Sequence, residues 1–457
     1  MSRANVDLLD AKRFLVMGLG KSGRAAARLL ALEGYEVGIA DDDDAVVSGS
    51  MASAEIAPLA GRIEAVRSGE AARYLRRDDA LVVSPGVPLS HPLVKSARER
   101  GVVVTGEIEV AYRYCASPII AVTGTNGKST VVNVTGKILE TAGKRTVVAG
   151  NIGTPFASVV EKRDPYDVIV LEISSFQLDT IIDFRADVAV LTNVTVDHLD
   201  RYQDSFDLYA QSKARILNRT ASKEAFVYNA DDPVCVRIAG GFAGMKIPFS
   251  SSRPLEQGVF FENGGIVRRL RGSAERIADR EDFPPIGVHN LENAMTAIAA
   301  VTPFGIPTAR IREALNNYRP LSHRMEPVRT LRGVTYIDDS KATNVDATIK
   351  SIKSVEGKVV VILGGSDKNL DFRPLADHAG RMRLAILIGQ ASPRIRAVLE
   401  GRCELASAPS LEDAVRQASQ AASPGDTVLL APACASFDMF RNYAHRGEVF
   451  RGAVESL

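Results

Sequence analysis

A short apolar run leads into a glycine-rich loop and then into a helix-forming segment, and this junction constrains the fold more than any other part of the chain. The segment Pro118–Thr130 reads PIIAVTGTNGKST, and Lys128 and Ser129 lie where the helix is expected to begin. A strand, a tight loop and a helix N-terminus in this order present backbone N–H groups and a positive helix end to a polyphosphate. The lysine ammonium can reach the outer phosphates, and the serine hydroxyl can ligate Mg²⁺. The junction therefore predicts a nucleotide-binding α/β domain.

The loop departs from the usual phosphate-binding pattern in its length. Two residues separate Gly124 from Gly127, where the usual pattern has four. An ordinary strand–turn–helix corner with incidental glycines is the alternative explanation. The phosphate-binding interpretation is favoured because strand, loop and helix all fall where the mechanism needs them. Apolar residues also recur at helical spacing over Val131–Ile138.

Composition limits the class of protein. The chain has 457 residues, more than one hydrophobic core usually serves, so two to three domains are expected. It is 46% hydrophobic and 24% charged, as soluble globular enzymes commonly are. A net charge of +1 provides no broad electrostatic field for nucleic acid or an anionic membrane. An acidic substrate therefore has to be met by local basic groups.

Cysteine usage and the first residues indicate the compartment. The four cysteines are scattered without metal-ligand spacing, which is typical of reduced thiols in the cytosol. The opening segment MSRANVDLLDAKR lacks the apolar run of a signal peptide. No apolar stretch is long enough to span a bilayer. We therefore expect a cytoplasmic protein that binds neither a membrane nor nucleic acid.

Apolar runs bounded by Gly, Asp or Pro divide the chain into three α/β blocks, placed at residues 1–116, 117–319 and 320–457. Such runs, separated by helical segments, are typical of buried parallel strands. A helix is expected over Arg24–Leu32. The strands expected in the first block are Arg13–Met17, Tyr35–Ala40, Ala80–Val83 and Val102–Val104. Those in the second block are Ile119–Thr123, Thr146–Val148, Val168–Ile173, Val188–Leu191 and Ala225–Tyr228. Those in the third block are Val334–Ile337, Lys358–Leu363, Leu384–Ile388 and Thr427–Leu430.

The alternation of strands and helices predicts open, mostly parallel sheets with helices on both faces. The fold class is therefore α/β with three domains: a Rossmann-like N-terminal domain, a central P-loop ATPase-like domain and a Rossmann-like C-terminal domain. A weaker region, Ser250–Asp282, is expected to contain a hairpin at Asn263-Gly264. Ligands of open α/β sheets bind beyond the carboxyl ends of the strands, which is where the unusual polar motifs of this chain cluster.

A second glycine motif, GLGKSG at Gly18–Gly23, follows the first strand and opens a helix, and the acidic run Asp41–Asp44 follows the next strand. This is the layout of a dinucleotide-binding site, and NAD is its default ligand. The physical requirement is only a diphosphate, which a UDP group satisfies equally. The acidic run is equally compatible with a solvated loop. The loop Ser84–Pro88 ends a strand and could close over the same ligand.

Three polar side chains near strand ends or on helices are candidates for chemistry. Glu172 ends an apolar strand, where a carboxylate could hold Mg²⁺ together with Ser129, and the alternative is an acid that faces solvent. His198 follows another strand, although a lone histidine is more often structural than a ligand. Lys213, considered by itself, is expected to be a surface lysine on a helix.

Two further positions depend on spacing. Asn290 and Asn293 are three residues apart in an expected helix, so they share one face. Lys368 follows an expected strand and a pair of glycines, and it is either a solvated loop lysine or a cation for an acidic ligand.

The chain resembles the Mur ligase family, in order and over essentially its whole length. The resemblance is carried by the segments GTNGKST, LEISSFQLD, TNVTVDHLDRY, SKARI, HNLENA, HRME and DDSKATN. Members are ATP-dependent amide-bond ligases that build the peptide stem of bacterial peptidoglycan. The segments GLGKSG, SPGVP, GGSDKNLDF and PACASFDMFRNY are most similar to members that add D-glutamate to UDP-N-acetylmuramoyl-L-alanine, and a DNPR-type signature of diaminopimelate- or lysine-adding members is absent.

The resemblance implies a reaction in which the substrate carboxylate attacks the γ-phosphate of ATP. The acyl phosphate is then attacked by the amine of D-glutamate. It also implies two Mg²⁺ ions, a carbamylated Lys213, closure of the third domain over ATP, and a monomer. The catalytic residues would be Lys128, Glu172, His198 and Lys213, and the metal ligands Ser129, Glu172, His198 and the carbamate of Lys213.

The resemblance also assigns binding residues to each substrate. For ATP it implies Gly124, Thr125, Asn126, Gly127, Lys128, Ser129, Thr130, Asn290, Asn293, Arg324, Asp339 and Lys341. For the UDP-substrate it implies Lys21, Ser22, Asp41, Asp42, Gly86, Asn151, Ser174, Gln177 and His198. For D-glutamate it implies Thr343, Lys368, Ser436, Phe437 and Tyr443, the last at a position that is often Phe in the family.

Three alternatives remain open at this point. An NAD-dependent oxidoreductase would use Gly18–Gly23, but it leaves Lys128, Glu172 and His198 without a role. Another ligase of the same fold is the second alternative: one similar to folylpolyglutamate synthase would have no use for a UDP-binding first domain, whereas a Mur-type ligase for a different amino acid stays open. A regulatory module that binds a nucleotide without catalysing a reaction would not need residues that bind a metal ion and an amino-acid substrate.

Overall fold

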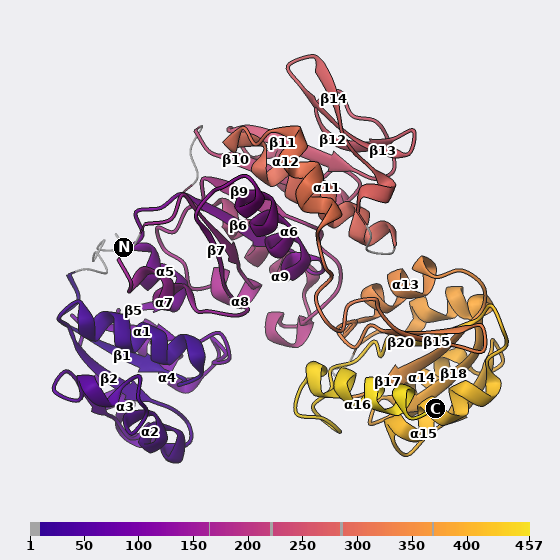
Figure 1. The fold of residues 1–457 in the computed structure, drawn as a ribbon. Helices are drawn as coiled ribbons and strands as arrows, with labels where there is room; N and C mark the ends of the chain where they lie inside the picture. The colour runs from indigo at the N-terminus through magenta and orange to yellow at the C-terminus, as the bar shows by residue number, and fades with distance from the viewer. Residues whose placement is uncertain (1–9, 164, 220–222, 284–286, 368–369) are drawn as a thin grey trace.

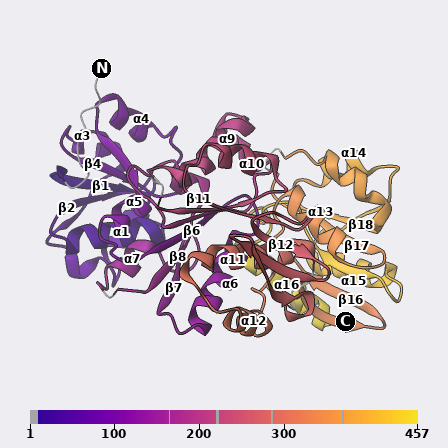
Figure 2. The same cartoon turned by 90° about the horizontal axis from the view of Figure 1, so that it is seen from above.

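The structure is a computed structural model that describes residues 10–457, except residues 164, 220–222, 284–286 and 368–369. It contains three β-sheets, and each lies in one of the three blocks expected from the sequence. Figure 1 shows three lobes in chain order, and Figure 2 shows the first and third lobes at opposite ends of the molecule with the central lobe between them. We refer to them as the N-terminal, central and C-terminal domains.

The N-terminal domain contains a five-stranded parallel sheet in the order β3-β2-β1-β4-β5. Its strands are β1 (Arg13–Met17), β2 (Glu36–Ala40), β3 (Ile63–Ala65), β4 (Ala80–Val83) and β5 (Val103–Gly106). Its α-helices are α1 (Lys21–Leu32), α2 (Asp44–Met51), α3 (Ala71–Tyr74), α4 (Pro92–Glu99) and α5 (Glu107–Tyr112). The Rossmann-like arrangement is confirmed. The sequence does not reveal β3, since only one of its three residues is buried.

The central domain contains a nine-stranded sheet in the order β14-β13-β12-β11-β10-β9-β6-β8-β7, parallel from β7 to β12 and antiparallel beyond. Its strands are β6 (Ile119–Thr123), β7 (Thr146–Gly150), β8 (Val168–Glu172), β9 (Val188–Leu191), β10 (Ala225–Asn229), β11 (Met245–Ser250), β12 (Gly258–Glu262), β13 (Gly265–Leu270) and β14 (Ser273–Asp279). The hairpin expected at Asn263-Gly264 joins β12 to β13, and both residues have positive φ, 49° and 76°, as a two-residue turn requires.

The helices of the central domain are α6 (Lys128–Thr141), α7 (Phe156–Val160), α8 (Ser175–Leu178), α9 (Phe206–Ala214), α10 (Pro233–Gly240), α11 (Val288–Val301) and α12 (Thr308–Asn316). Within the sheet, β6 lies between β8 and β9. The loops that follow these three strands therefore meet at one edge, because the strands are parallel.

The C-terminal domain contains a six-stranded sheet in the order β15-β16-β20-β17-β18-β19, in which only β15 is antiparallel to its neighbour. Its strands are β15 (Glu326–Leu331), β16 (Val334–Asp338), β17 (Val359–Gly364), β18 (Met382–Ile388), β19 (Glu404–Ser407) and β20 (Thr427–Leu430). Its α-helices are α13 (Val345–Ser354), α14 (Ser392–Leu399), α15 (Leu411–Ala421) and α16 (Tyr443–Glu455).

The hydrophobic cores join two of the domains and leave the third apart. One apolar cluster contains residues of both the N-terminal and the central domain, including Ile108 and Phe156. Two buried acids reinforce this junction: Glu107 accepts from the backbone N–H of Ala157 at 2.6 Å, and Glu109 accepts from that of Phe184 at 2.9 Å. Burial raises the pKa of Glu107 to about 7. The C-terminal domain packs around two clusters made only of its own residues.

Candidate active site

The glycine-rich loop between β6 and α6 has the conformation that the sequence predicts. Gly124 and Gly127 have φ values of 147° and 88°, and α6 begins at Lys128. A Cβ atom at Gly127 would lie 2.3 Å from Oδ1 of Asn293, and one at Gly124 would lie 1.9 Å from Oγ1 of Thr192. Glycine is therefore required at both positions, because neighbouring elements approach the loop backbone directly.

Lys128 turns back over the loop that precedes it. Its Nζ donates to the carbonyl oxygens of Gly124 and Thr125, both at 2.9 Å. Burial lowers the pKa of the Lys128 ammonium, and the negative charges of Glu172 and Asp197 oppose that shift. The ammonium is thus held at the loop, where an anion could replace the carbonyl oxygens as its partner.

Lys213 also contacts this loop, so the sequence-based expectation of a surface lysine is wrong. It lies on α9, its residue is 2% exposed, and its Nζ donates to the carbonyl of Gly124 at 2.7 Å. The ammonium nitrogen lies 4.5 Å from the ring centroid of Tyr209. Burial, and then the charge of Lys128, lower the pKa of Lys213 well below its usual value. The helix is packed against the loop, a long-range contact that local sequence does not report.

Glu172 is 2% exposed at the end of β8, which excludes the alternative of an acid facing solvent. Its Oε1 accepts from Nδ2 of Asn151 at 2.9 Å, and its Oε2 is buried without a hydrogen-bond partner. A buried carboxylate oxygen without a partner fits a cation ligand, since such an atom is otherwise costly. The residues here therefore fit Mg²⁺, with Ser129 and His198 on the same cavity.

His198 follows β9 and has a left-handed backbone, with φ of 53°. Its ring packs edge-on against Phe176, with centroids 5.1 Å apart, and its Nε2 lies 3.8 Å from Oδ2 of Asp197. The histidine and the neighbouring aspartate both line the cavity that the loop also lines.

A cavity of about 220 Å³ brings most of the candidate catalytic residues together. It lies between the central and C-terminal domains and includes side chains from both. The predicted residues that line it are Thr125, Asn126, Gly127, Lys128, Ser129, Asn151, Glu172, Ser174, His198, Lys213, Arg324, Lys341 and Thr343.

A second cavity, of about 70 Å³, also borders the loop. The predicted residues that line it are Asn126, Gly127, Thr130, Asn290, Asn293, Arg324, Asp339 and Lys341. Asn290 and Asn293 share one face of α11, as their spacing predicts, and Nδ2 of Asn293 lies 3.4 Å from Oδ1 of Asn290. Burial raises the pKa of Asp339 to about 6, and the hydroxyl of Ser351 donates to its carboxylate.

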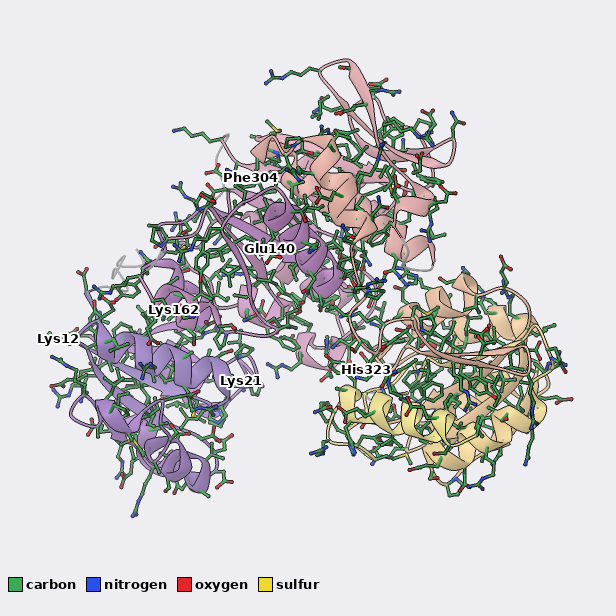
Figure 3. The ribbon with its side chains drawn as sticks, viewed as in Figure 1. Lys12, Lys21, Glu140, Lys162, Phe304 and His323 are labelled. Atoms are coloured by element: carbon green, nitrogen blue, oxygen red, sulfur yellow. The ribbon has the colours of Figure 1, made fainter. Side chains whose placement is uncertain are left out.

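The residues of the N-terminal domain that are predicted to bind the UDP-substrate include several at or near the glycine motif Gly18–Gly23. Lys21 and Ser22 open α1, and in the view of Figure 3 Lys21 lies on the margin of this domain that is turned toward the C-terminal domain. Asp41 is not merely solvated: its carboxylate accepts from the backbone N–H of Leu19, inside the motif, at 2.8 Å. Asp42 pairs with His91 at 3.0 Å.

A large cavity of about 900 Å³ separates the N-terminal domain from the central domain and is lined by Gln177. Arg201 of the central domain crosses this junction and donates to the carbonyl of Gly86 at 3.2 Å. Ser174 and Gln177 form a capping box at the start of α8, which fixes both side chains. The cavity thus connects the Ser84–Pro88 loop to the residues beside the phosphate loop.

The residues predicted to bind D-glutamate do not all line one cavity. Thr343 lines the 220 Å³ cavity, and Lys341 places its Nζ 3.9 Å from the ring centroid of Tyr443, the first residue of α16. Ser436 is 2% exposed, whereas Phe437 is 72% exposed. Lys368 lies outside the described residues. The structure therefore brings Thr343 to the phosphate loop but does not place Phe437 in a pocket.

Sequence reasoning missed several residues that line the same cavity as the loop. Asp197, Tyr209 and Asn344 are buried there, and the Tyr209 hydroxyl lies 3.1 Å from Oγ1 of Thr125. Asn193 accepts from the backbone N–H of Asn126 at 2.9 Å. Asn193 and Asp197 lie in the same segment after β9 as the predicted residue His198, so the position after a strand end was the available signal.

The segment between the central and C-terminal domains is held by a charged cluster. Nδ1 of His323 lies 2.7 Å from Oδ2 of Asp338, and Glu326 accepts from the His323 backbone N–H at 2.9 Å while pairing with Arg451 at 2.6 Å. Among the described residues, His323, Glu326 and Asp338 form the one group of three potential metal-ligating side chains whose ligand atoms all lie within 4.8 Å of one another. Its oxygens already have protein partners, which favours a structural role. Figure 3 shows His323 at the start of the C-terminal domain.

This cluster predicts a pH dependence of stability. The hydrogen bond that the His323 ring donates to Asp338 raises the pKa of His323, although burial opposes it. The stabilising contribution is therefore fully present below the unfolded pKa of about 6.5 and is lost as pH rises through the higher folded pKa. We expect the melting temperature of the wild type, relative to that of His323→Gln, to fall over this range. Calorimetry at a series of pH values measures it, and parallel curves for the two proteins would contradict the assignment.

The fold and the loop define a three-domain α/β protein with a phosphate-loop site between its domains. Residues 12–106 match the Mur ligase MurD-like N-terminal domain, residues 122–301 the Mur ligase middle domain, and residues 323–434 the Mur ligase glutamate ligase domain. The chain therefore belongs to the Mur ligase family.

Curated relatives match over the full length. A protein of Acidobacterium capsulatum is 42% identical over 450 residues, which cover 98% of this chain and 96% of the relative. A protein of Geotalea uraniireducens is 41% identical over 459 residues, 99% of each chain. Both are named UDP-N-acetylmuramoylalanine–D-glutamate ligase.

Solved structures share the fold at low identity. A pseudomurein peptide ligase type C from Methanothermus fervidus superposes with a TM-score of 0.62 at 19% identity, covering 97% of this chain and 99% of that one. The UDP-N-acetylmuramate-alanine ligase of Thermotoga maritima gives 0.58 at 18% identity, with the same coverage. Within the described residues, no helix combines the length and apolar character needed to cross a membrane.

Proposed function

We propose that this chain is an ATP-dependent ligase that joins D-glutamate to UDP-N-acetylmuramoyl-L-alanine through an acyl phosphate, in peptidoglycan precursor synthesis. One observation carries the proposal most directly. Lys128 and Lys213 share the carbonyl of Gly124 as acceptor, and Glu172, with an unpartnered oxygen, lines the same cavity. Two lysines that share one loop carbonyl, beside a buried carboxylate oxygen without a hydrogen-bond partner, fit a site for a polyphosphate and its metal ions better than a site for hydride transfer.

The likeness to relatives supports the choice of substrates. Full-length proteins at 41–42% identity carry the name of the D-glutamate ligase. The chain of a solved Escherichia coli protein called FolC, in complex with DHPP and ADP, covers 76% of this chain, so part of this chain has no counterpart there. A first domain with its own glycine motif is expected of a ligase that binds a UDP-substrate.

The residues act in three groups in the proposed reaction. ATP would lie across the loop, with its base near Asn290 and Asn293 and its phosphates toward Lys128 and Arg324. The UDP-substrate would bind at Lys21, Ser22, Asp41, Asp42 and Gly86 and extend toward Asn151, Ser174 and Gln177. D-Glutamate would meet Thr343, Lys368, Ser436, Phe437 and Tyr443.

The chain's own groups would supply the electrostatics of the transfer. Lys128 would leave the loop carbonyls and donate to the transferring phosphoryl group, whose charge it offsets in a site shielded from water. Its lowered pKa does not prevent this role, because the arriving phosphate favours the ammonium form. The amine of D-glutamate would then attack the carbonyl carbon of the acyl phosphate and inorganic phosphate would leave, within one cavity that keeps the acyl phosphate from hydrolysis.

Mg²⁺ would be held by Ser129, Glu172 and His198, and a second ion by carbamylated Lys213 together with these residues. When bound, the ions would neutralise charge on the phosphates. Lys213 suits carbamylation because its lowered pKa makes the neutral amine available to react with CO₂, releasing a proton and giving a carbamate.

The deciding experiment is phosphate release from ATP with Mg²⁺ and UDP-N-acetylmuramoyl-L-alanine. D-Glutamate is compared with L-glutamate, L-alanine, L-lysine and meso-diaminopimelate. We expect release that depends on D-glutamate. Release with another amino acid would keep the reaction and reassign the C-terminal pocket. No release with any of them, together with binding of a nicotinamide dinucleotide, would favour the oxidoreductase.

A further inference from the structure

One side chain of the C-terminal domain contacts the phosphate loop and the acid beside His198 at the same time. Asn344 is the N-cap of α13, and its Oδ1 accepts from the backbone N–H of Ala347 at 2.9 Å. Its Nδ2 donates to Oδ1 of Asn126 at 3.2 Å and to Oδ2 of Asp197 at 3.0 Å. The residue is 3% exposed. Every polar atom of this side chain is therefore engaged, and two of its three contacts cross to the central domain.

A neighbouring carboxylate completes the contact with the loop. Oδ2 of Asp346 accepts from Nδ2 of Asn126 at 2.8 Å. Lys350, one turn later on α13, lies 3.0 Å from the same carboxylate and offsets its charge. Both polar atoms of the Asn126 amide are thus bound by the first turn of α13.

The partners of Asn344 are parts of the candidate active site. The backbone of Asn126 is fixed within the central domain, since its N–H donates to Asn193 at 2.9 Å and its carbonyl accepts from Thr192 at 2.6 Å. Asp197 exerts its negative charge on both Lys128 and Lys213. A change in the position of Asn344 would therefore affect the conformation of the loop at Asn126. It would also affect the placement of the Asp197 carboxylate, whose charge acts on Lys128 and Lys213.

We propose that Asn344 is a positioning residue that couples docking of the C-terminal domain to the conformation of the phosphate loop and to the orientation of Asp197. The inference rests on the proposed function for its effect on turnover. The C-terminal domain has its own apolar cores, so polar contacts such as these determine how it docks. Asn344 acts through Asn126 and Asp197 and need not touch a substrate.

Two substitutions separate docking from helix capping. Asn344→Asp retains an oxygen that caps α13, but it has no N–H donor and sets a carboxylate against Asp197. Asn344→Ser also caps, is neutral, and is too short to reach the central domain. Lys353→Ala, at an exposed position on the same helix, is the control. We expect both Asn344 variants to lower kcat by about 10- to 100-fold, as losing one neutral and one charge-assisted hydrogen bond implies.

The same variants distinguish positioning from a structural defect. Affinity for the UDP-substrate should change by less than about twofold, because that substrate binds mainly to the N-terminal domain. The melting temperature should match that of the Lys353→Ala control. Small-angle scattering should show a larger radius of gyration for Asn344→Asp than for the wild type. Unchanged kcat in both variants would overturn the proposal, as would a loss of UDP-substrate affinity equal to the loss of turnover.

Failure of the proposed function gives a different pattern. If the wild type itself releases no phosphate with D-glutamate, turnover is uninformative and scattering decides the docking role. An expanded Asn344→Asp protein beside a compact wild type would then support coupling without ligase chemistry. Equal radii of gyration in all variants would overturn the coupling.

Discussion

Lys128→Ala is expected to lower turnover by at least about 10³-fold while the UDP-substrate still binds. The ammonium lies at the start of α6, and its Nζ is 2.9 Å from each of two loop carbonyl oxygens. Its loss leaves the charge of the transferring phosphoryl group without its nearest counter-charge. The measurement is steady-state phosphate release, paired with calorimetric titration of the UDP-substrate.

A matched control lies on the same helix. Lys137 is on α6 and lines none of the described cavities, so Lys137→Ala should keep near-normal turnover. If Lys128→Ala retains turnover like that of this control, the assignment of the loop as the phosphate site is wrong. A parallel loss of UDP-substrate affinity would instead indicate that the first and second domains do not bind separate ligands.

Lys213→Ala is expected to be inactive and to regain part of its activity with a short carboxylic acid such as acetate. The side chain is buried beside Lys128 and Tyr209, and its pKa is lowered well below the usual value by burial. Such an amine can take up CO₂ and become an anion, which a small acid in the vacated space would replace. Activity is measured over a series of acid concentrations.

Adding the same acid to Lys128→Ala tests whether the rescue is specific to Lys213→Ala. The acid should not rescue Lys128→Ala, because that variant lacks a cation rather than an anion. Full activity of Lys213→Ala without added acid would remove the residue from the metal site. Equal rescue of both variants would point to a nonspecific salt effect.

Much of the fold follows from apolar runs in the sequence. Strands such as β4 and β9 appear at the expected residues because each is a short, fully apolar run bounded by polar residues. β3 and β19 escape that reasoning, since they are short and half-exposed at sheet edges. The hairpin at Asn263-Gly264 was predictable because its turn residues tolerate positive φ.

The residues of the candidate site also fall into those that local sequence predicts and those that it does not. Gly124, Gly127 and Lys128 are recognisable from local spacing, because the loop's ability to bind phosphate depends on its own backbone. Lys213 is not, because its burial results from the packing of α9 against a loop 89 residues away in sequence. Asn344 is also hidden in the sequence, where it is an ordinary helix cap before α13.

The sequence by itself determined three parallel-sheet domains, a phosphate loop at the end of β6 and the family resemblance, since these depend on local patterns of polarity and glycine. Only the tertiary structure decided that Lys213 faces Lys128, that Glu172 keeps an oxygen without a partner, and that Asn344 joins two domains. The physical reason is that burial, and with it the pKa and hydrogen bonding of a side chain, depends on residues far away along the chain.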